Sequence, residues 1–220
     1  MTTILYQDQA ILVVDKPAGL SVLSDGWEPN SPYLVKQLEV DYSRVWVVHR
    51  LDKITSGVLL LALTAEAHRI LNYQFEHHSV DKLYNAIVTG DPRWDNHTAR
   101  HPLRVNVGHS HRTVVDHSLG KPSETHFSVL KRFGQASLLE AIPRTGRTHQ
   151  VRVHAYALGH PLIADALYSA PPTDLIQRPA LHAASLSFTH PLSNERMTFE
   201  SPYPDDFAQA LQKLINKNTA

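Results

Sequence analysis

The sequence predicts an α+β fold with a mixed, mostly antiparallel central sheet that helices and loops flank. Short segments rich in aliphatic residues, such as residues 11–14 and 84–89, have the length and pattern of strands. Polar turns join several of these segments as hairpins, and a few longer segments carry apolar residues at helical spacing. Because no linker-like stretch interrupts the 220 residues, we expect one domain that spans residues 1–220.

In the first half of the chain, the expected strands are short apolar runs between polar residues, at residues 4–6, 11–14, 45–48, 57–63 and 84–89. Lys16-Pro17-Ala18-Gly19 and Thr55-Ser56-Gly57 are expected to form turns. A short helix is expected at residues 33–40. A longer helix is expected at residues 65–75, where the apolar residues are spaced for one face and Thr64 suits the N-cap.

In the second half, further apolar runs predict strands at residues 113–115, 127–130, 137–141, 186–189 and 197–200. Apart from the first of these, residues 92–122 are expected to be a loop, because they are rich in His, Arg, Asn and Pro. Helices are expected at residues 148–158, with Gly159 at the end, and at residues 207–215.

Composition excludes several classes of protein. Lys and Arg total 21, as do Asp and Glu, so the bulk basic character of many nucleic-acid-binding proteins is missing, although 15 His residues can gain charge near neutral pH. The absence of Cys excludes disulfides, thiolate catalysis and cysteine-bound zinc, and fits a cytoplasmic protein. No signal peptide and no apolar run near the ~20 residues of a membrane span are present, so no membrane partner is expected.

The first segment that carries chemistry runs from His49 to Gly57, where an expected strand leads into a cluster of opposite charges. A strand end can hold a carboxylate rigidly at the edge of a cleft. The positive charge of Arg50 favours the ionised form of Asp52. The alternative interpretation is a surface turn with a solvated Asp52–Arg50 pair.

The second segment holds three arginines and two histidines within eleven residues and has no acid: Arg144, Arg147, His149, Arg152 and His154. Arg144, Arg147 and a helix N-terminus near Thr148 suit phosphate oxygens. Arg152 follows Thr148 by one helical turn and can point inward. An inward arginine needs an acidic partner, for which Asp52 is the candidate. The alternative is a basic, solvated helix face.

These segments resemble signature motifs of the RluA-type pseudouridine synthases of the RsuA/RluA superfamily, His-Arg-Leu-Asp-x-x-Thr-Ser-Gly and Gly-Arg-Thr-His-Gln-x-Arg-Val-His. Four further segments are similar to motifs of that family and occur in the same order. They are Lys16-Pro17-Ala18-Gly19-Leu20, Lys82-x-Tyr84-x-Ala86, His160-Pro161 to Asp165, and Leu181-His182-Ala183. Many relatives carry an extra N-terminal, S4-like RNA-binding domain, and we expect this chain to be the short form without it. Ala164 stands where relatives commonly have glycine, so we expect a small local adjustment there.

The resemblance implies a pseudouridine synthase fold with a catalytic cleft, and an enzyme that isomerises specific uridines of ribosomal or transfer RNA without cofactor or metal. Asp52 would be the essential carboxylate, which attacks the anomeric carbon or removes a ribose proton. Arg152 would pair with Asp52, and Tyr84 would pack on the target base. Arg50 would fill the gap that the flipped nucleotide leaves in the RNA helix.

The same resemblance implies a set of residues that bind the RNA substrate: His49, Arg50, Thr55, Lys82, Arg144, Arg147, Thr148 and His149. The expected partner is a stem-loop of rRNA or tRNA, and we expect a monomer. Two other functions stay open. One is an RNA-binding module without chemistry, and the other is a carboxylate-dependent glycosidase, which needs a second carboxylate that the motifs do not supply.

A few features have competing interpretations. The histidines at 101, 109, 111 and 117 suggest a metal site, but an RNA-contacting loop with Arg100, Arg104 and Arg112, or a solvated loop, explains them as well. His77 and His78 are interpreted as residues of a helix end, and Trp27 and Trp46 as core or cleft wall. Ser56 near His49 lacks the Gly-x-Ser-x-Gly setting of a hydrolase nucleophile.

Overall fold

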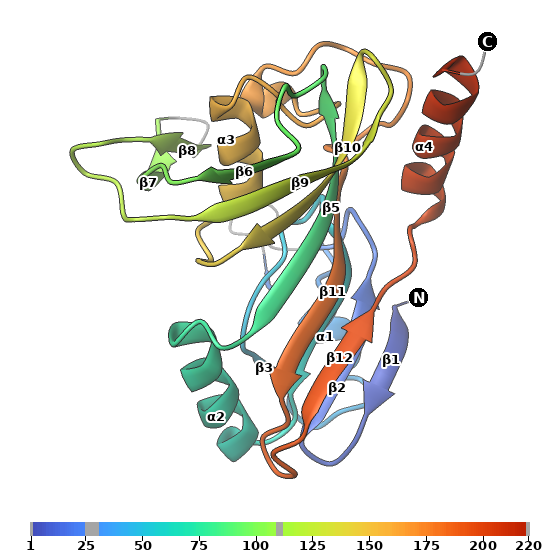
Figure 1. Ribbon diagram of the computed structural model, residues 1–220. Helices are drawn as coiled ribbons and strands as arrows, with labels where there is room; N and C mark the ends of the chain where they lie inside the picture. The colour runs from blue at the N-terminus through green and yellow to red at the C-terminus, as the bar shows by residue number, and fades with distance from the viewer. Residues whose placement is uncertain (1, 25–30, 109–111, 219–220) are drawn as a thin grey trace. The chain divides into compact units, whose positions relative to one another are not determined.

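The computed structural model of the chain describes residues 2–24, 31–108 and 112–218. Trp27, His109 and His111 lie outside the described residues. The chain forms two compact units, the first from Met1–Lys82 and Ala183–Pro202, the second from Leu83–His182 and Tyr203–Ala220. It passes from one to the other within β5 (Asp81–Thr89) and β11 (Leu181–Thr189), and again after Pro202 (Figure 1). The expectation of one domain over residues 1–220 stays a prediction.

The strands of the first unit form a sheet in the order β1–β2–β4–β11, with β3 paired to β4 and β12 paired to β11. Their bounds are β1 Thr3–Gln7, β2 Ile11–Lys16, β3 Trp46–Val47, β4 Ser56–Ala62 and β12 Arg196–Glu200. β2 and β4 pair antiparallel, from Ile11 opposite Ala62 to Lys16 opposite Gly57. Every residue of β4 is buried, which explains why its sequence is an unbroken apolar run and not an alternating one.

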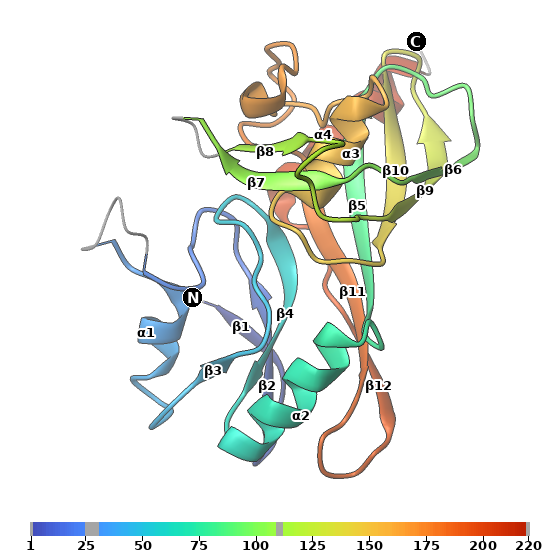
Figure 2. The same cartoon turned by 90° about the vertical axis from the view of Figure 1, so that its left-hand side faces the viewer.

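Two helices belong to the first unit, α1 (Leu34–Leu38) and α2 (Ala65–Glu76), and α2 lies along the sheet (Figure 2). The predicted cap of α2 is confirmed, because the Thr64 hydroxyl accepts a hydrogen bond from the Ala67 backbone N–H at 3.1 Å. Ala67 and Leu71 enter a core cluster shared with the buried strands, and Trp46 is half-buried against it. Trp46 therefore belongs to the core wall, with the Arg44 guanidinium 3.8 Å from its ring centroid.

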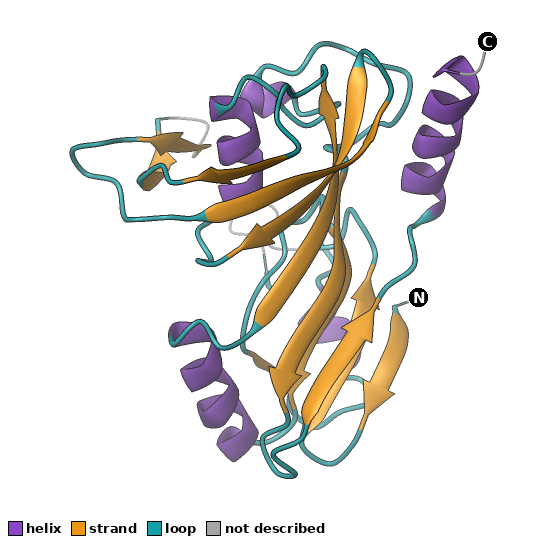
Figure 3. Cartoon of the chain, in the orientation of Figure 1, coloured by secondary structure: helices purple, strands orange, loops and turns teal. Residues whose placement is uncertain are grey.

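The main strands of the second unit pair in the order β5–β10–β9–β6. Its other elements are β6 Asn96–Ala99, β7 Leu103–Val107, β8 Arg112–Val115, β9 Thr125–Arg132, β10 Ala136–Pro143, α3 Gln150–Ala157, the 3-10 helix η1 Ala166–Tyr168, and α4 Asp205–Asn218. Val151 and Ala155 of α3 enter a core cluster with apolar residues of β5, β9 and β10. Phe207 and Ala210 of α4 are buried in a second cluster with Ile87. The mostly antiparallel strands and few helices confirm the α+β prediction (Figure 3).

The strand predicted at residues 113–115 is confirmed as part of β8, but the prediction that the rest of residues 92–122 form a loop is wrong. β6 pairs with β9, from Asn96 opposite Ser128 to Ala99 opposite Thr125, and β7 and β8 pair with each other in a separate two-stranded sheet. β6 is an edge strand with one fully buried residue, Ala99, so backbone pairing and not apolar alternation defines it. Its polar composition therefore resembles that of a loop.

Candidate active site

Asp52 is half-buried on a turn of the first unit that connects β3 to β4. The Asp52 carbonyl accepts a hydrogen bond from the Thr55 backbone N–H at 3.0 Å, and Thr55 itself is buried. Arg50 is exposed two residues earlier. The turn thus spans Asp52 to Thr55, while Ser56 already belongs to β4 and is buried. The prediction of a turn at Thr55-Ser56-Gly57 is wrong, since the buried strand begins at Ser56.

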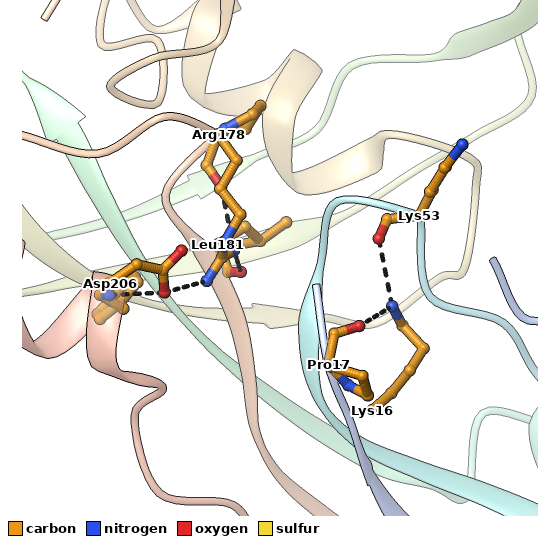
Figure 4. Close-up of polar contacts among 8 residues, drawn as sticks. Lys16, Pro17, Lys53, Arg178, Leu181 and Asp206 are labelled. Carbon is orange, nitrogen blue, oxygen red and sulfur yellow. Dashed lines mark hydrogen bonds and ion pairs between the residues drawn. The ribbon is translucent and has the colours of Figure 1, made fainter. Parts of the chain in front are cut away.

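A buried lysine fixes the backbone next to this turn. The Lys16 side chain is fully buried, and its ammonium donates to the carbonyls of Pro17 at 2.8 Å and Lys53 at 3.4 Å (Figure 4). It also donates to the Leu20 carbonyl at 2.9 Å. The Gly19 backbone N–H donates to the same Lys53 carbonyl at 2.7 Å. An ammonium has three N–H donors, which allows one side chain to join two loops. Lys16 therefore holds the segment that directly follows Asp52, a role that the sequence pattern did not indicate.

His49 lies between the strand and helix layers of the first unit. Its Nε2 accepts a hydrogen bond from the Leu60 backbone N–H at 3.0 Å, and its ring stacks on Phe75 at 4.6 Å between centroids. Burial, and then the charge of Lys82, lower the pKa of His49 to about 3. The ring is therefore neutral at physiological pH, and these contacts are structural. Its expected contact with RNA stays a prediction, as does that of half-buried Lys82.

We expect the free energy of unfolding to fall as the pH drops below about 6.5, the pKa of histidine in an unfolded chain. Burial also lowers the pKa of His154, to about 4. Both His49 and His154 therefore stay neutral in the folded chain but bind protons in the unfolded chain. The unfolded chain thus binds more protons in this window, and each ring lowers the stability by at most about 1.4 kcal/mol per pH unit. The measurement is urea denaturation between about pH 5 and 7.

In this measurement, His49→Gln and His154→Gln should each make the dependence on pH shallower. His77→Gln is the matched control, because the His77 ring is exposed at the end of α2. Equal slopes in all three variants and the parent would contradict the assignment.

Arg152 of α3 points into the second unit and is buried, as predicted. Its Nε and Nη2 donate to the two carboxylate oxygens of Asp165 at 2.7 and 2.8 Å. Its guanidinium carbon lies 5.1 Å from the centroid of the Tyr168 ring. The sequence pattern predicts Asp52 as the partner of Arg152 and does not indicate Asp165, which stands out only as part of a later motif. The pairing with Asp52 stays a prediction.

The segment before α3 is organised by Gln150, another buried residue that the sequence analysis missed. The Gln150 amide oxygen accepts from the Thr145 hydroxyl at 2.6 Å and from the Arg147 backbone N–H at 3.1 Å. Its amide nitrogen donates to the Glu124 carbonyl at 2.8 Å and to Thr125 Oγ1 at 3.0 Å. The Gln150 side chain thereby connects the loop of residues 144–149 to the start of β9.

The helix begins later than the sequence predicts. His149 is the N-cap residue, in a left-handed conformation with φ 56°, and Gln150 is the first helical residue. Thr148 therefore does not cap the helix, and it is exposed, as is Arg144. Arg147 is half-buried, and its Nε finds no hydrogen-bond acceptor among the residues that the structure describes. A guanidinium N–H without an acceptor suits a phosphate oxygen.

Tyr84 lies on β5 of the second unit, opposite Ala141 of β10, and is half-buried at the edge of a core cluster. Asp52, Arg50, His49, Thr55 and Lys82 belong to the first unit, whereas Tyr84, Arg152 and the 144–149 segment belong to the second.

The histidine-rich segment is tied into the second unit. The His154 Nε2 donates to the His101 carbonyl at 3.2 Å, and Arg104 pairs with Asp116 at 3.1 Å. Arg100 pairs with Glu124 at 2.8 Å. Within residues 2–24, 31–108 and 112–218, no group of three or more His, Asp or Glu is arranged to hold a metal ion. No helix in these ranges has the length and apolar character needed to cross a membrane.

The family model of RNA pseudouridylate synthases matches residues 10–157, a range that contains the segment from His49 to Gly57 and the segment from Arg144 to His154. The chain belongs to the RNA pseudouridylate synthase family. The predicted enzyme class, an isomerase that forms pseudouridine, is thereby confirmed.

Similar pseudouridine synthases span most of this chain. Ribosomal large subunit pseudouridine synthase C of Escherichia coli O157:H7 is 40% identical over 225 residues, which cover 97% of this chain and 70% of that protein. The dual-specificity RNA pseudouridine synthase RluA of Salmonella typhi is 38% identical over 202 residues, which cover 90% and 92%. The structure of human RNA pseudouridylate synthase domain containing 1 is 29% identical, with a TM-score of 0.77 over 100% of this chain and 95% of that one. The resemblance to RluA-type pseudouridine synthases is confirmed.

At one position this pseudouridine synthase departs from the expected motif. Ala164 stands at the expected glycine position and has φ 61°, in the left-handed region. A residue with a Cβ atom pays about 1–2 kcal/mol to adopt that conformation. Ala164 adopts this conformation although it is unfavourable for alanine. This indicates that the backbone position of the next residue, Asp165, is tightly specified.

Proposed function

We propose that this pseudouridine synthase modifies uridines of ribosomal RNA, with Asp52 as the essential carboxylate. The observation that carries the proposal is the family match over residues 10–157, which contains the motif around Asp52 and the motif around Arg152. The name of the Escherichia coli relative, a ribosomal large subunit enzyme, supports rRNA as the substrate. Transfer RNA is the second candidate, because another relative is named as dual-specific. The proposed compartment is the cytoplasm, and the proposed state is a monomer.

The proposed reaction leaves the composition of the nucleoside unchanged. The bond from the ribose C1′ to N1 of uracil breaks, the base rotates, and C1′ bonds to C5. The proton on C5 leaves, and N1 gains one. An ionised Asp52 is required whether it attacks C1′ or removes a ribose proton.

The other proposed roles follow from their chemistry. Arg152 keeps Asp52 charged and oriented. The Tyr84 ring packs on the uracil and assists proton transfer at the ring. The target uridine is extruded from the RNA helix, because the sugar and the base edge are hidden in stacked RNA. Arg144, Arg147, Thr148 and His149 are proposed to hold the phosphates, with His49, Thr55 and Lys82 beside Asp52.

The reaction is tested with rRNA and tRNA that carry tritium at C5 of uridine. Pseudouridine formation releases this tritium, and sequencing-based mapping of total RNA with and without the protein identifies the site. RNA binding without tritium release would instead favour a binding module, and cleavage of simple glycosides would favour a glycosidase.

Arg50→Ala is expected to lower kcat/KM about tenfold on a folded stem-loop, because the exposed guanidinium is proposed to replace the flipped base in the stack. The free energy of unfolding should change by less than about 0.5 kcal/mol. Arg69→Ala, which removes an exposed arginine from α2 of the same unit, should keep the parental kinetics. Parental kinetics of Arg50→Ala on the stem-loop would show that Arg50 does not support flipping.

A further inference from the structure

The ion pair between Arg152 and Asp165 is buried on both sides. Asp165 has no exposed surface, and 5% of Arg152 is exposed. Removing two charges from water is unfavourable, and an apolar pair of similar volume often gives equal or greater stability. The two parallel hydrogen bonds, at 2.7 and 2.8 Å, also define the plane of the guanidinium. Geometry, not stability, is therefore the clearest consequence of this pair.

The Tyr168 ring limits Arg152 from a second direction. It is buried, and its centroid lies 5.1 Å from the guanidinium carbon. Its hydroxyl donates to the Thr113 carbonyl and accepts from the Thr113 N–H, both at 3.1 Å. Because the single hydroxyl proton is used, the His149 Nδ1 at 3.0 Å must donate to the same oxygen. The ring is thus fixed by three hydrogen bonds and cannot rotate away from Arg152.

The backbone also specifies where Asp165 lies. The Ile163 N–H donates to the Ile87 carbonyl of β5 at 2.9 Å, which fastens this segment to the strand that carries Tyr84. The Asp165 carbonyl accepts from the N–H groups of Tyr168 at 3.0 Å and Ala170 at 3.1 Å. The carboxylate is therefore part of a rigid turn and not of a flexible loop.

We propose that Asp165 is a positioning residue, which sets the direction of the Arg152 guanidinium for the isomerisation. With Nε and Nη2 both bound to Asp165, the direction of Nη1 is determined as well. The inference rests on the proposed role of Arg152 in the reaction. It assigns to Asp165 an effect on the chemical step that acts through Arg152, without contact with the substrate.

The first test is Asp165→Asn, which keeps the size of the side chain but loses one acceptor and the charge. We expect the single-turnover rate constant at saturating enzyme to fall about 100-fold, because small displacements of reacting groups have effects of this size. The dissociation constant for RNA should stay within about twofold. An unchanged rate constant in the folded variant would overturn the proposal.

The second unit offers a matched control. Arg178 donates to both carboxylate oxygens of Asp206, at 2.7 and 3.0 Å, and to the Leu181 carbonyl at 3.0 Å (Figure 4). Partial burial acts to raise the pKa of Asp206, but the hydrogen bonds and charge of Arg178, with backbone N–H groups, lower it. Asp206→Asn therefore breaks a similar bidentate pair of the same unit. Its rate constant should equal that of the parent.

A double-variant cycle separates positioning from a general structural effect. If Asp165 acts through Arg152, Asp165→Asn should not slow the Arg152→Ala enzyme further. A full 100-fold effect on that background would overturn the proposal. A parental rate of Arg152→Ala alone would instead refute the proposed role of Arg152. If Asp165→Asn does not fold, Asp165→Glu retains the charge but shifts the carboxylate, and a parental rate of that variant would equally overturn the proposal.

Discussion

Asp52→Asn is expected to reduce pseudouridine formation to background, a loss of at least about 10⁴-fold. Asparagine has nearly the size of aspartate, but it can neither attack an anomeric carbon nor remove a ribose proton. The side chain is half-buried, and the hydrogen bond that forms the turn uses the Asp52 carbonyl and the Thr55 N–H, which the substitution leaves in place. The fold and the affinity for RNA should therefore persist.

Tritium release from RNA under single-turnover conditions measures this loss, and thermal unfolding and filter binding check the fold and the RNA affinity. Asp41→Asn makes the same change of charge in the first unit, at an exposed residue after α1, and should react at the parental rate. Turnover by Asp52→Asn within about tenfold of the parent would remove Asp52 from the chemistry. If Asp52→Asn does not fold, Asp52→Ala and Asp52→Glu are measured in its place. A rate near that of the parent in either variant would likewise show that Asp52 takes no part in the chemistry.

Local signals in the sequence predict much of the fold. The helix α2 follows from one apolar face and a Thr64 cap, both of which depend on residues within a few positions of each other. The buried strand β4 is an unbroken apolar run and is predicted equally well. β6 was missed because its definition comes from β9, which lies about thirty residues later in the chain and supplies its backbone partners.

At the candidate site, too, features that depend on adjacent residues are predictable and features that depend on distant residues are not. The motif around Asp52 is visible because its residues are adjacent, whereas Asp165 is separated from Arg152 by the end of a helix and a turn. The burial of the Lys16 ammonium was not predictable for a different reason, since its acceptors are backbone carbonyls, which every residue has. The left-handed conformation of His149 is likewise uncommon for a residue with a side chain, and a histidine at this position does not by itself predict it.

Gly57→Ala is expected to lower the free energy of unfolding by more than about 4 kcal/mol, which is exceptional for one methyl group. Gly57 lies in β4 with φ 118°. A Cβ atom there would lie 2.1 Å from the carbonyl oxygen of Ala183 in β11, and 2.7 and 2.8 Å from its carbonyl carbon and its nitrogen. These are backbone atoms of a neighbouring strand in the same unit, so no side-chain rotation relieves the overlap.

Gly134→Ala separates this overlap from the effect of backbone conformation alone. Gly134 has φ 75° in the turn between β9 and β10, and no atom lies within 4 Å of an added Cβ. It should lose only about 1 kcal/mol. Urea denaturation of both variants gives the comparison. If Gly57→Ala were as mild as Gly134→Ala, β4 and β11 would be able to separate at low energy. The turn that carries Asp52 would then not be held by the close approach of these strands, and its rigidity would rest on Lys16 and the Thr55 hydrogen bond alone.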